Sequence, residues 1–516
     1  MTRQRYGLVL LGVVLLLASP GDRAGAKGLA ERVIEHKLAN GLTVLMVERH
    51  QTPVVSINLT FKVGGMNEYT GITGVAHLYE HMAFKGTRAL GTKDYERERP
   101  LLEELARINE TIEELRGSSR NASTTESSEI EELRRAFKET QKKAAVLVVG
   151  NEMSLLYQRQ GAVGLNASTS KDVTRYTVSL PANRLPLWAA IESDRMANPV
   201  LREFFKERSV VLKERKLRTE DSPNGLLYET FAAAAFQAHP YGFPTIGWAS
   251  DIQRLTPSLT REFFHTHYGP SNAVVAIVGD FNPPEVVKLI EGSFSAIPAT
   301  APPPPVVTVE PAQRGERRVQ VEFDAEPVVL IGYHKPPIGH PDDFVCDVLD
   351  SVLSEGITSR LYRRLVLEKR LAASVYTTSG YPGVLAPNLF VVGTTPLAPH
   401  TTRELEQAVY EELDRLKTEP VGVEELEKVL NNLDASLVRS LRSNSGLASQ
   451  LAYFQTVAGD WRYLLEARDR IAAVTPADIQ RVASKYLIKS NRTVATLVRN
   501  APGPRASADK PRSVMP

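Results

Sequence analysis

The sequence is poor in cysteine and has no excess of charge of either sign. Only one cysteine, Cys346, is present among 516 residues, so an intramolecular disulfide is excluded. Cys346 lies in an apolar, helical-looking stretch, and we expect it to be a small core residue. The 62 Lys and Arg residues nearly balance the 60 Asp and Glu residues, which leaves a formal net charge of +2. This balance argues against a nucleic-acid binder and against a strongly basic membrane-surface protein.

Long apolar runs are also missing. After the N-terminal segment, no apolar run reaches the roughly eighteen residues of a membrane-spanning helix. Residues 1–26 differ from the rest. Arg3 and Arg5 precede an apolar run at residues 7–18, and small residues at 24–26 form an A-x-A cleavage pattern. We expect a cleaved signal peptide and a periplasmic or secreted protein that has no membrane attachment after cleavage. An uncleaved N-terminal anchor is the alternative.

The chain is too long for a single hydrophobic core and should form several domains. A proline-rich segment, residues 298–313, contains four consecutive prolines, which cannot join a helix or a central strand. We interpret it as a linker between an N-terminal domain (27–297) and a C-terminal domain (314–500), followed by a disordered tail (501–516).

The two halves repeat one another. A Thr-Pro helix start, a Ser-Asn pair and a valine-containing strand occur at residues 256–278 and recur at 475–498, at one constant offset. A repeat of this length indicates a duplicated domain rather than a solenoid. Strand-like runs such as residues 42–48 alternate with helix-spaced apolar patterns such as 203–220, which favours an α+β fold with one α/β sandwich in each half.

A charged helical pattern at residues 94–160 interrupts the first half, and turn-forming residues divide it near its middle. We interpret this segment as a helical-hairpin insertion that projects from the first domain. A solvated decoration and a role in substrate gating or partner contact both remain open.

The strongest chemical signal is the sequence H-x-x-E-H at residues 77–81. On a helix, His77 and His81 are four residues apart, so both imidazoles project from one face and can share one metal ion. Glu80 lies beside that metal position, where its carboxylate can serve as general base and then general acid on a metal-activated water. Two surface histidines on an amphipathic helix are the alternative.

A catalytic zinc ion needs a third protein ligand and an open coordination position. Two carboxylates, Glu207 and Glu214, are seven residues apart in a helical segment and therefore share a face. Spacing alone does not distinguish a ligand from its neighbour.

Three segments resemble the pitrilysin/insulinase-type metallopeptidases. They are G-V-A-H-L-Y-E-H-M-A-F-K-G-T at residues 74–87, G-L-N-A-S-T at 164–169, and E-R-x-V-x-x-x-E beginning at Glu207. The resemblance extends over essentially the whole chain after the signal peptide. It implies that Glu214 completes a site for one Zn²⁺ with the two histidines and that Glu207 supports it. The long interval before Glu214 corresponds to the hairpin insertion.

The resemblance also suggests where the peptide substrate binds. Asn166 and Ala167 lie in what looks like an edge strand, to which an extended peptide could add through main-chain hydrogen bonds. A turn or bulge role for Asn166 is the alternative.

The second half departs from the family pattern. Val366 stands where the family has an Arg, and Ala373 stands where it has a Tyr, the two residues that bind substrate and stabilise the oxyanion. Loss of such donors typically lowers the rate by about a hundred- to a thousandfold. Either a homologous partner subunit supplies them, or Arg364 or Tyr376 of this chain substitutes after a local shift in register.

We therefore expect a zinc-dependent endopeptidase that hydrolyses peptides or small unfolded proteins, as a heterodimer with a homologous subunit bearing Arg and Tyr, or as a homodimer. A non-hydrolytic scaffold or chaperone-like subunit of a heteromeric complex is the alternative from another class. The intact H-x-x-E-H motif favours the peptidase.

Overall fold

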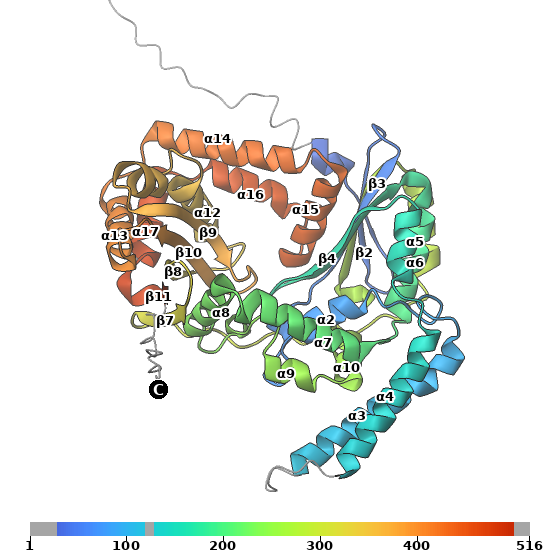
Figure 1. Cartoon of the computed structure of the whole chain (residues 1–516). Coiled ribbons are helices and arrows are strands. Elements are labelled where there is room, and N and C mark those ends of the chain that lie inside the picture. The colour runs from blue at the N-terminus through green and yellow to red at the C-terminus, as the bar shows by residue number, and fades with distance from the viewer. Residues whose placement is uncertain (1–27, 119–127, 500–516) are drawn as a thin grey trace, which may run out of the picture.

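The computed structural model describes residues 28–118 and 128–499. The predicted signal peptide and the predicted C-terminal tail lie outside these residues. Two mixed β-sheets, one in each half of the chain, form the framework of the protein (Figure 1). The first sheet has six strands in the order β1 (Ile34–Lys37), β2 (Thr43–Glu48), β6 (Ala273–Gly279), β3 (Val54–Phe61), β5 (Thr174–Pro181) and β4 (Val163–Thr169). The second has five, in the order β7 (Arg317–Phe323), β11 (Arg492–Arg499), β8 (Val328–Lys335), β10 (Asn388–Pro396) and β9 (Ala372–Tyr381).

The two sheets have the same topology apart from the additional edge strand β1. In the first, β6 runs parallel to β2 and antiparallel to β3. In the second, β11 runs parallel to β7 and antiparallel to β8. Each of these central strands follows a helix whose N-cap is a threonine, α10 (Pro257–His267) after Thr256 and α17 (Pro476–Tyr486) after Thr475. The predicted duplication and the α+β class are therefore confirmed.

Helices from the same half cover one face of each sheet. The first sheet is covered by α2 (Val75–Met82), α6 (Leu185–Ala197), α10 and α11 (Pro283–Phe294). The second is covered by α12 (Pro341–Ser354), α13 (Thr402–Thr418), α14 (Val423–Ser440) and α17. Cys346 on α12 is a core residue, as predicted, and is 2% exposed. Helices α7 (Phe204–Arg215), α9 (Ala249–Arg254) and α16 (Tyr463–Ala472) also belong to the body.

The other face of each sheet is covered by a helix of the opposite half. Helix α8 (Pro223–Ala235) packs on β7 and β11 of the second sheet, and helix α15 (Asn444–Val457) packs on β3 and β6 of the first. We call α8 and α15 the exchanged helices. Each begins at a serine N-cap whose hydroxyl accepts a hydrogen bond from a glycine N–H three residues later. Buried side chains such as Phe231 on α8 and Leu451 on α15 each stabilise this arrangement by about 1.5–3 kcal/mol.

The insertion in the first half is a helical hairpin, as predicted. Helices α3 (Tyr95–Ser118) and α4 (Ser128–Leu147) pack on each other through isoleucines and project away from the body (Figure 1). A buried ion pair between Arg202 and Glu98 fixes the base of the hairpin. The predicted segment also contained α5 (Glu152–Arg159), which instead belongs to the body because Met153 and Tyr157 are buried in the first core.

Residues 298–314 form no helix or strand, as expected of the proline-rich linker. The Glu310 carboxylate holds the linker in place by accepting hydrogen bonds from three successive backbone N–H groups, those of Gln237, Ala238 and His239. Within residues 28–118 and 128–499, no helix has the length and apolar character needed to cross a membrane.

Candidate metal centre

Helix α2 carries the H-x-x-E-H motif and packs against α7 and β4. It begins after Gly74, which has a φ of 88° and lies against the backbone of residues 246–247. A Cβ atom at this position would lie 2.5 Å from the carbonyl oxygen of Ile246, so a glycine is required. The start of the motif helix is thereby fixed against the loop that precedes α9.

His77, His81 and Glu214 converge from α2 and α7. Nε2 of His77 lies 3.7 Å from Oε1 of Glu214, and Nε2 of His81 lies 3.3 Å from Oε2 of the same carboxylate. One ligand atom from each of the three residues falls within 4.8 Å of the others. Two atoms bound to a tetrahedral zinc ion at about 2.0–2.1 Å are about 3.3–3.4 Å apart, so the three side chains fit such an ion.

The two imidazoles have different electrostatic environments. Burial lowers the pKa of His77 to about 3, and the nearby His81 and Arg218 act in the same direction, so His77 is neutral as a metal ligand must be. The pKa of His81 is raised because its Nδ1 interacts with the Glu207 carboxylate at 3.5 Å.

Glu207 therefore contacts Nδ1 of His81, and Nε2 of the same imidazole is directed toward Glu214. The other Glu207 oxygen lies 2.6 Å from the ammonium of Lys85. Burial pushes the pKa of Glu207 upward, but the hydrogen bonds from His81 and Lys85 outweigh it and hold the pKa below its usual value. A carboxylate in this position fixes the orientation of a metal-binding imidazole.

Glu80 lies on the same helix and is held by the end of strand β4. The hydroxyl of Thr169 donates a hydrogen bond of 2.6 Å to Oε2 of Glu80. Burial raises the pKa of Glu80, and the Thr169 hydrogen bond opposes that shift. A carboxylate with a raised pKa is better matched to accepting a proton near neutral pH.

Strand β4 is an edge strand of the first sheet, as predicted, and pairs with β5 on one side only. Asn166 lies opposite Thr177, and Ala167 lies opposite Tyr176. The pairing is irregular between Val163 and Asn166, so Asn166 also follows a bulge. The free edge of β4 therefore runs beside the helix that carries Glu80.

Two family models match the sequence, and the first of them contains the H-x-x-E-H motif. The model for insulinase-type peptidases, peptidase family M16, matches residues 43–128, and the model for the peptidase M16 inactive domain matches residues 254–433. Together they cover slightly more than half of the chain. The chain belongs to peptidase family M16.

Curated relatives of this M16 chain are named as zinc proteases. Zinc protease PqqE of Helicobacter pylori is 28% identical over 497 residues, which covers 95% of this chain and 98% of the relative. Zinc protease YmxG of Bacillus subtilis, described as uncharacterized, is 23% identical over 442 residues, which covers 84% of this chain and 91% of the relative.

Solved M16 structures have the same two-half fold. The crystal structure of a protease from Helicobacter pylori superposes with a TM-score of 0.75 at 28% identity and covers 90% of this chain and 99% of that chain. A Pseudomonas fluorescens structure described as a peptidase M16 inactive domain has a TM-score of 0.71 at 17% identity, with 91% and 98% covered, which bears on the fold alone.

In the described part of the second half of this M16 chain, the two fallback side chains, Arg364 and Tyr376, already have partners. Val366 packs against the second core from a π-helical turn, and Ala373 is exposed on β9. Of the two fallback side chains, Arg364 forms an ion pair of 2.9 Å with Glu368. The hydroxyl of Tyr376 is hydrogen-bonded to that of Tyr228 on the exchanged helix α8.

Two charged residues at this site have no clear signal in the sequence. Arg218, on the π-helical turn after α7, places Nη1 2.9 Å from Oε1 of Glu214, with 74% of its side chain exposed. Glu68 is 3% exposed, and its two oxygens accept hydrogen bonds from the N–H groups of Gly74 and Ala76, at 2.8 and 2.9 Å. Glu68 thus caps α2 through a carboxylate six residues before the N-cap Gly74, a distance at which no capping pattern is recognisable.

Replacing Glu68 with glutamine is expected to lower the free energy of unfolding by about 1–3 kcal/mol. A glutamine keeps one oxygen acceptor and places an NH₂ group against the other backbone N–H, which leaves a buried donor unpaired. Denaturant unfolding of the variant measures this loss. Glu262→Gln, an exposed change on α10, serves as the control, and equal stability of the two variants would show that Glu68 does not cap α2.

Proposed function

We propose that this chain is a zinc-dependent endopeptidase acting on peptides or small unfolded proteins. The convergence of His77, His81 and Glu214, with Glu80 one residue from the second histidine, carries the proposal. Two imidazoles and a carboxylate form the ligand set of many catalytic zinc sites, which leave one position open. The zinc protease names of the curated relatives agree with this assignment.

Zinc held by these three side chains would supply Lewis acidity that polarises the scissile carbonyl and acidifies water. The protein side chains have separate tasks. Glu80 removes a proton from the attacking water and later delivers it to the leaving amine. Thr169 holds the Glu80 carboxylate, and Glu207 holds the imidazole of His81 in its ligand orientation.

The substrate is proposed to bind as an additional strand on the free edge of β4. Main-chain groups around Asn166 and Ala167 would pair with an extended peptide and bring it alongside α2. Because main-chain pairing reads an extended shape more than a side-chain sequence, we expect broad selectivity among unfolded peptides.

A homologous subunit is proposed to complete the site. Val366 and Ala373 provide neither of the polar groups that the family uses in the second half, and Arg364 and Tyr376 have partners elsewhere. A partner with the Arg and Tyr would restore them in a heterodimer. A homodimer is the other arrangement, with the donors supplied by residues outside that pattern. The signal-type sequence at residues 1–26 places the protein, in this proposal, in the periplasm or outside the cell.

The purified chain is expected to bind one zinc ion and to cleave an unfolded peptide slowly. The missing donors should leave kcat about a hundred- to a thousandfold below the value reached with a homologous Arg- and Tyr-bearing subunit added. Metal analysis, together with cleavage of a quenched fluorescent peptide before and after chelation and zinc return, measures both quantities.

The outcomes separate the alternatives. Zinc binding without any hydrolysis, alone or with the partner, would favour the non-hydrolytic scaffold. Full activity of the isolated chain would refute the need for a partner while preserving the peptidase assignment.

A further inference from the structure

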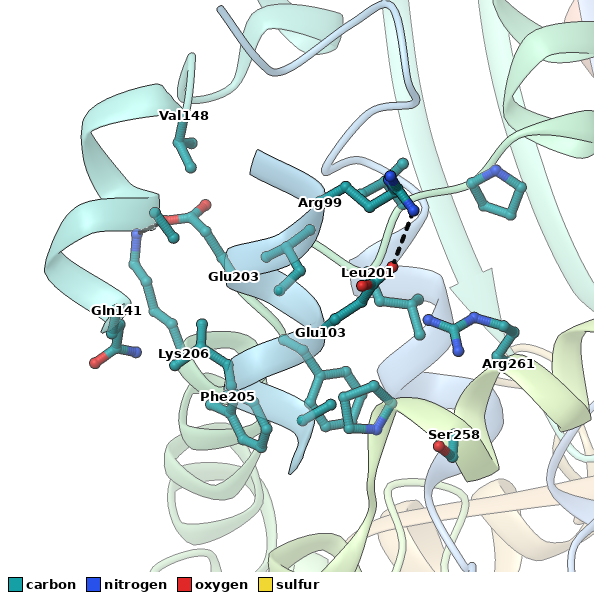
Figure 2. A pocket seen from close by; sticks show the side chains of 18 of the residues that line it. Arg99, Glu103, Gln141, Val148, Leu201, Glu203, Phe205, Lys206, Ser258 and Arg261 are labelled. Carbon is teal, nitrogen blue, oxygen red and sulfur yellow. Dashed lines mark hydrogen bonds and ion pairs between the residues drawn. The ribbon is translucent and has the colours of Figure 1, made fainter. Parts of the chain in front are cut away.

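A large groove lies between the inserted hairpin and the first half of the protein. Its volume is about 1160 Å³, and its walls come from α3, α4, α7, α10 and the segment that precedes α7 (Figure 2). The volume exceeds the range of about 300–1,000 Å³ that is usual for sites of small molecules. The metal-site residues His77, His81 and Glu214 are not among the residues that line it.

The groove has an apolar floor and a cationic rim. Buried side chains of Leu105, Val200, Phe204 and Phe264 form the floor. Seven exposed Arg and Lys side chains line the groove, namely Arg88, Arg99, Arg107, Lys142, Lys206, Lys213 and Arg261. Figure 2 shows Arg99 on α3, Lys206 on α7 and Arg261 on α10 around the same space.

Acidic side chains neutralise part of this rim. Arg99 and Lys206 pair with Glu103 and Glu203 of the groove, and Arg107 and Lys142 pair with Glu104 and Glu139 beside it. Glu110, the third glutamate of the groove, accepts a hydrogen bond from Ser258. In the part of the chain that the structure describes, Lys213 and Arg261 form no ion pair. The groove therefore presents cationic groups without a carboxylate partner, among them Lys213 on α7 and Arg261 on α10, beside an apolar floor.

We propose that this groove binds an acidic, apolar segment of the polypeptide substrate, at a distance in sequence from the bond that is cleaved. Charge complementarity is the first reason, because unpaired cations attract carboxylates and the floor accepts aliphatic or aromatic side chains. Lys213 and Arg261 lie on two different helices, which suits spaced carboxylates better than the single head group of a lipid.

The position of helix α7 is the second reason, and it rests on the proposed peptidase function. Lys206, Ser209 and Lys213 form one stripe of α7 that lines the groove, whereas Glu207 and Glu214 form the neighbouring stripe that faces α2. Adjacent residues of a helix are about 100° apart around its axis. A segment in the groove would thus contact the same helix that supplies the proposed third metal ligand, which places the two sites within reach of one extended polypeptide.

The first test measures binding and needs no hydrolysis. A fluorescent peptide of alternating glutamate and leucine is titrated into the full-length, zinc-loaded Glu80→Gln protein and followed by anisotropy. The Lys213→Gln/Arg261→Gln double variant should weaken binding about tenfold or more, because two charged contacts are lost. Ala145→Trp, which fills the groove from α4 without altering α7, should weaken it as strongly.

A matched control keeps the same change of charge elsewhere. Arg184→Gln/Lys288→Gln removes one arginine and one lysine that are exposed in the first half and do not line the groove, and binding should be unchanged. Equal affinity of the groove and control variants would overturn the proposal. Equal binding of the peptide with lysine in place of glutamate would also overturn it. The proposal would be overturned as well if phosphatidylglycerol vesicles displaced the peptide at a concentration of lipid head groups below that of the peptide carboxylates. The groove would then be a lipid site.

The second test identifies the occupant as substrate. In the otherwise unmodified enzyme, the double variant should raise KM severalfold for a long substrate with an acidic, apolar segment and leave kcat/KM of a short peptide unchanged. An unchanged KM for the long substrate would refute the substrate assignment. Because the binding test uses an uncleaved peptide, an absence of hydrolysis would remove the proposed function without deciding whether the groove binds acidic segments.

Discussion

Replacing Glu80 with glutamine is expected to reduce peptide hydrolysis by about three orders of magnitude while zinc remains bound. Positioned acid–base groups contribute about 10²–10⁴-fold to a rate, and Glu80 is the proposed group for both proton transfers. A glutamine has the same shape, and its oxygen still accepts the hydrogen bond from Thr169, so the helix and the three ligand residues should stay in place.

The measurement compares kcat/KM and zinc content in the same preparation. Glu262→Gln, exposed on α10, controls for the loss of one carboxylate and should match the unmodified enzyme in both. Turnover retained in the zinc-loaded Glu80→Gln variant would remove Glu80 from the mechanism. Loss of zinc from this variant would instead show that Glu80 helps to hold the metal.

Glu214→Gln is expected to weaken zinc binding by about a hundredfold or more. Structural zinc sites have apparent binding free energies of about 10–16 kcal/mol shared among four ligands, so one ligand accounts for roughly 3 kcal/mol. A neutral amide is a much poorer zinc ligand than a carboxylate. Peptide hydrolysis should fall with metal occupancy and should recover in part at high zinc concentration.

Glu207→Gln is the matched comparison, because both carboxylates lie on the same face of α7. It should weaken zinc binding by only about tenfold, the lower end of the range for residues that orient a ligand. Competition with a chelator measures both affinities. If Glu207→Gln lost zinc and Glu214→Gln kept it, the proposed roles of the two residues would be exchanged.

Local periodicity accounts for the parts of the site that the sequence predicted. His77 and His81 share a face because four residues make slightly more than one helical turn, and Glu207 and Glu214 share a face because seven make nearly two. These relations hold within any regular helix. They could not select between the two glutamates, since that choice depends on how α7 packs against α2, a contact between segments separated by the whole hairpin.

The other features that the sequence did not predict also depend on contacts between segments that are distant in the chain. Glu68 and Lys85 act through contacts that no short sequence pattern marks, because their partners are a helix terminus and a carboxylate on another element. Helix α5 continued the helical pattern of the hairpin without a break in composition, and only its burial assigns it to the body. The duplication could be predicted because a helix cap and a strand occur at the same spacing in both halves. The exchanged helices could not be predicted, because an amphipathic pattern does not indicate which sheet a helix covers.

The exchanged helices also have a consequence for how the protein matures. The outer face of β2 and β6, with Val47 and Val278 among its apolar side chains, is complete once residue 279 has been made. Its cover, α15, ends only at Val457. At a synthesis rate of about 5–20 residues per second, this apolar surface remains exposed to solvent for roughly ten to forty seconds on each nascent chain. In a fragment cut at the proline linker, the outer face of β2 and β6 would remain exposed to solvent permanently. The polypeptide therefore reaches its native state as one unit and not as two domains that fold separately and then join.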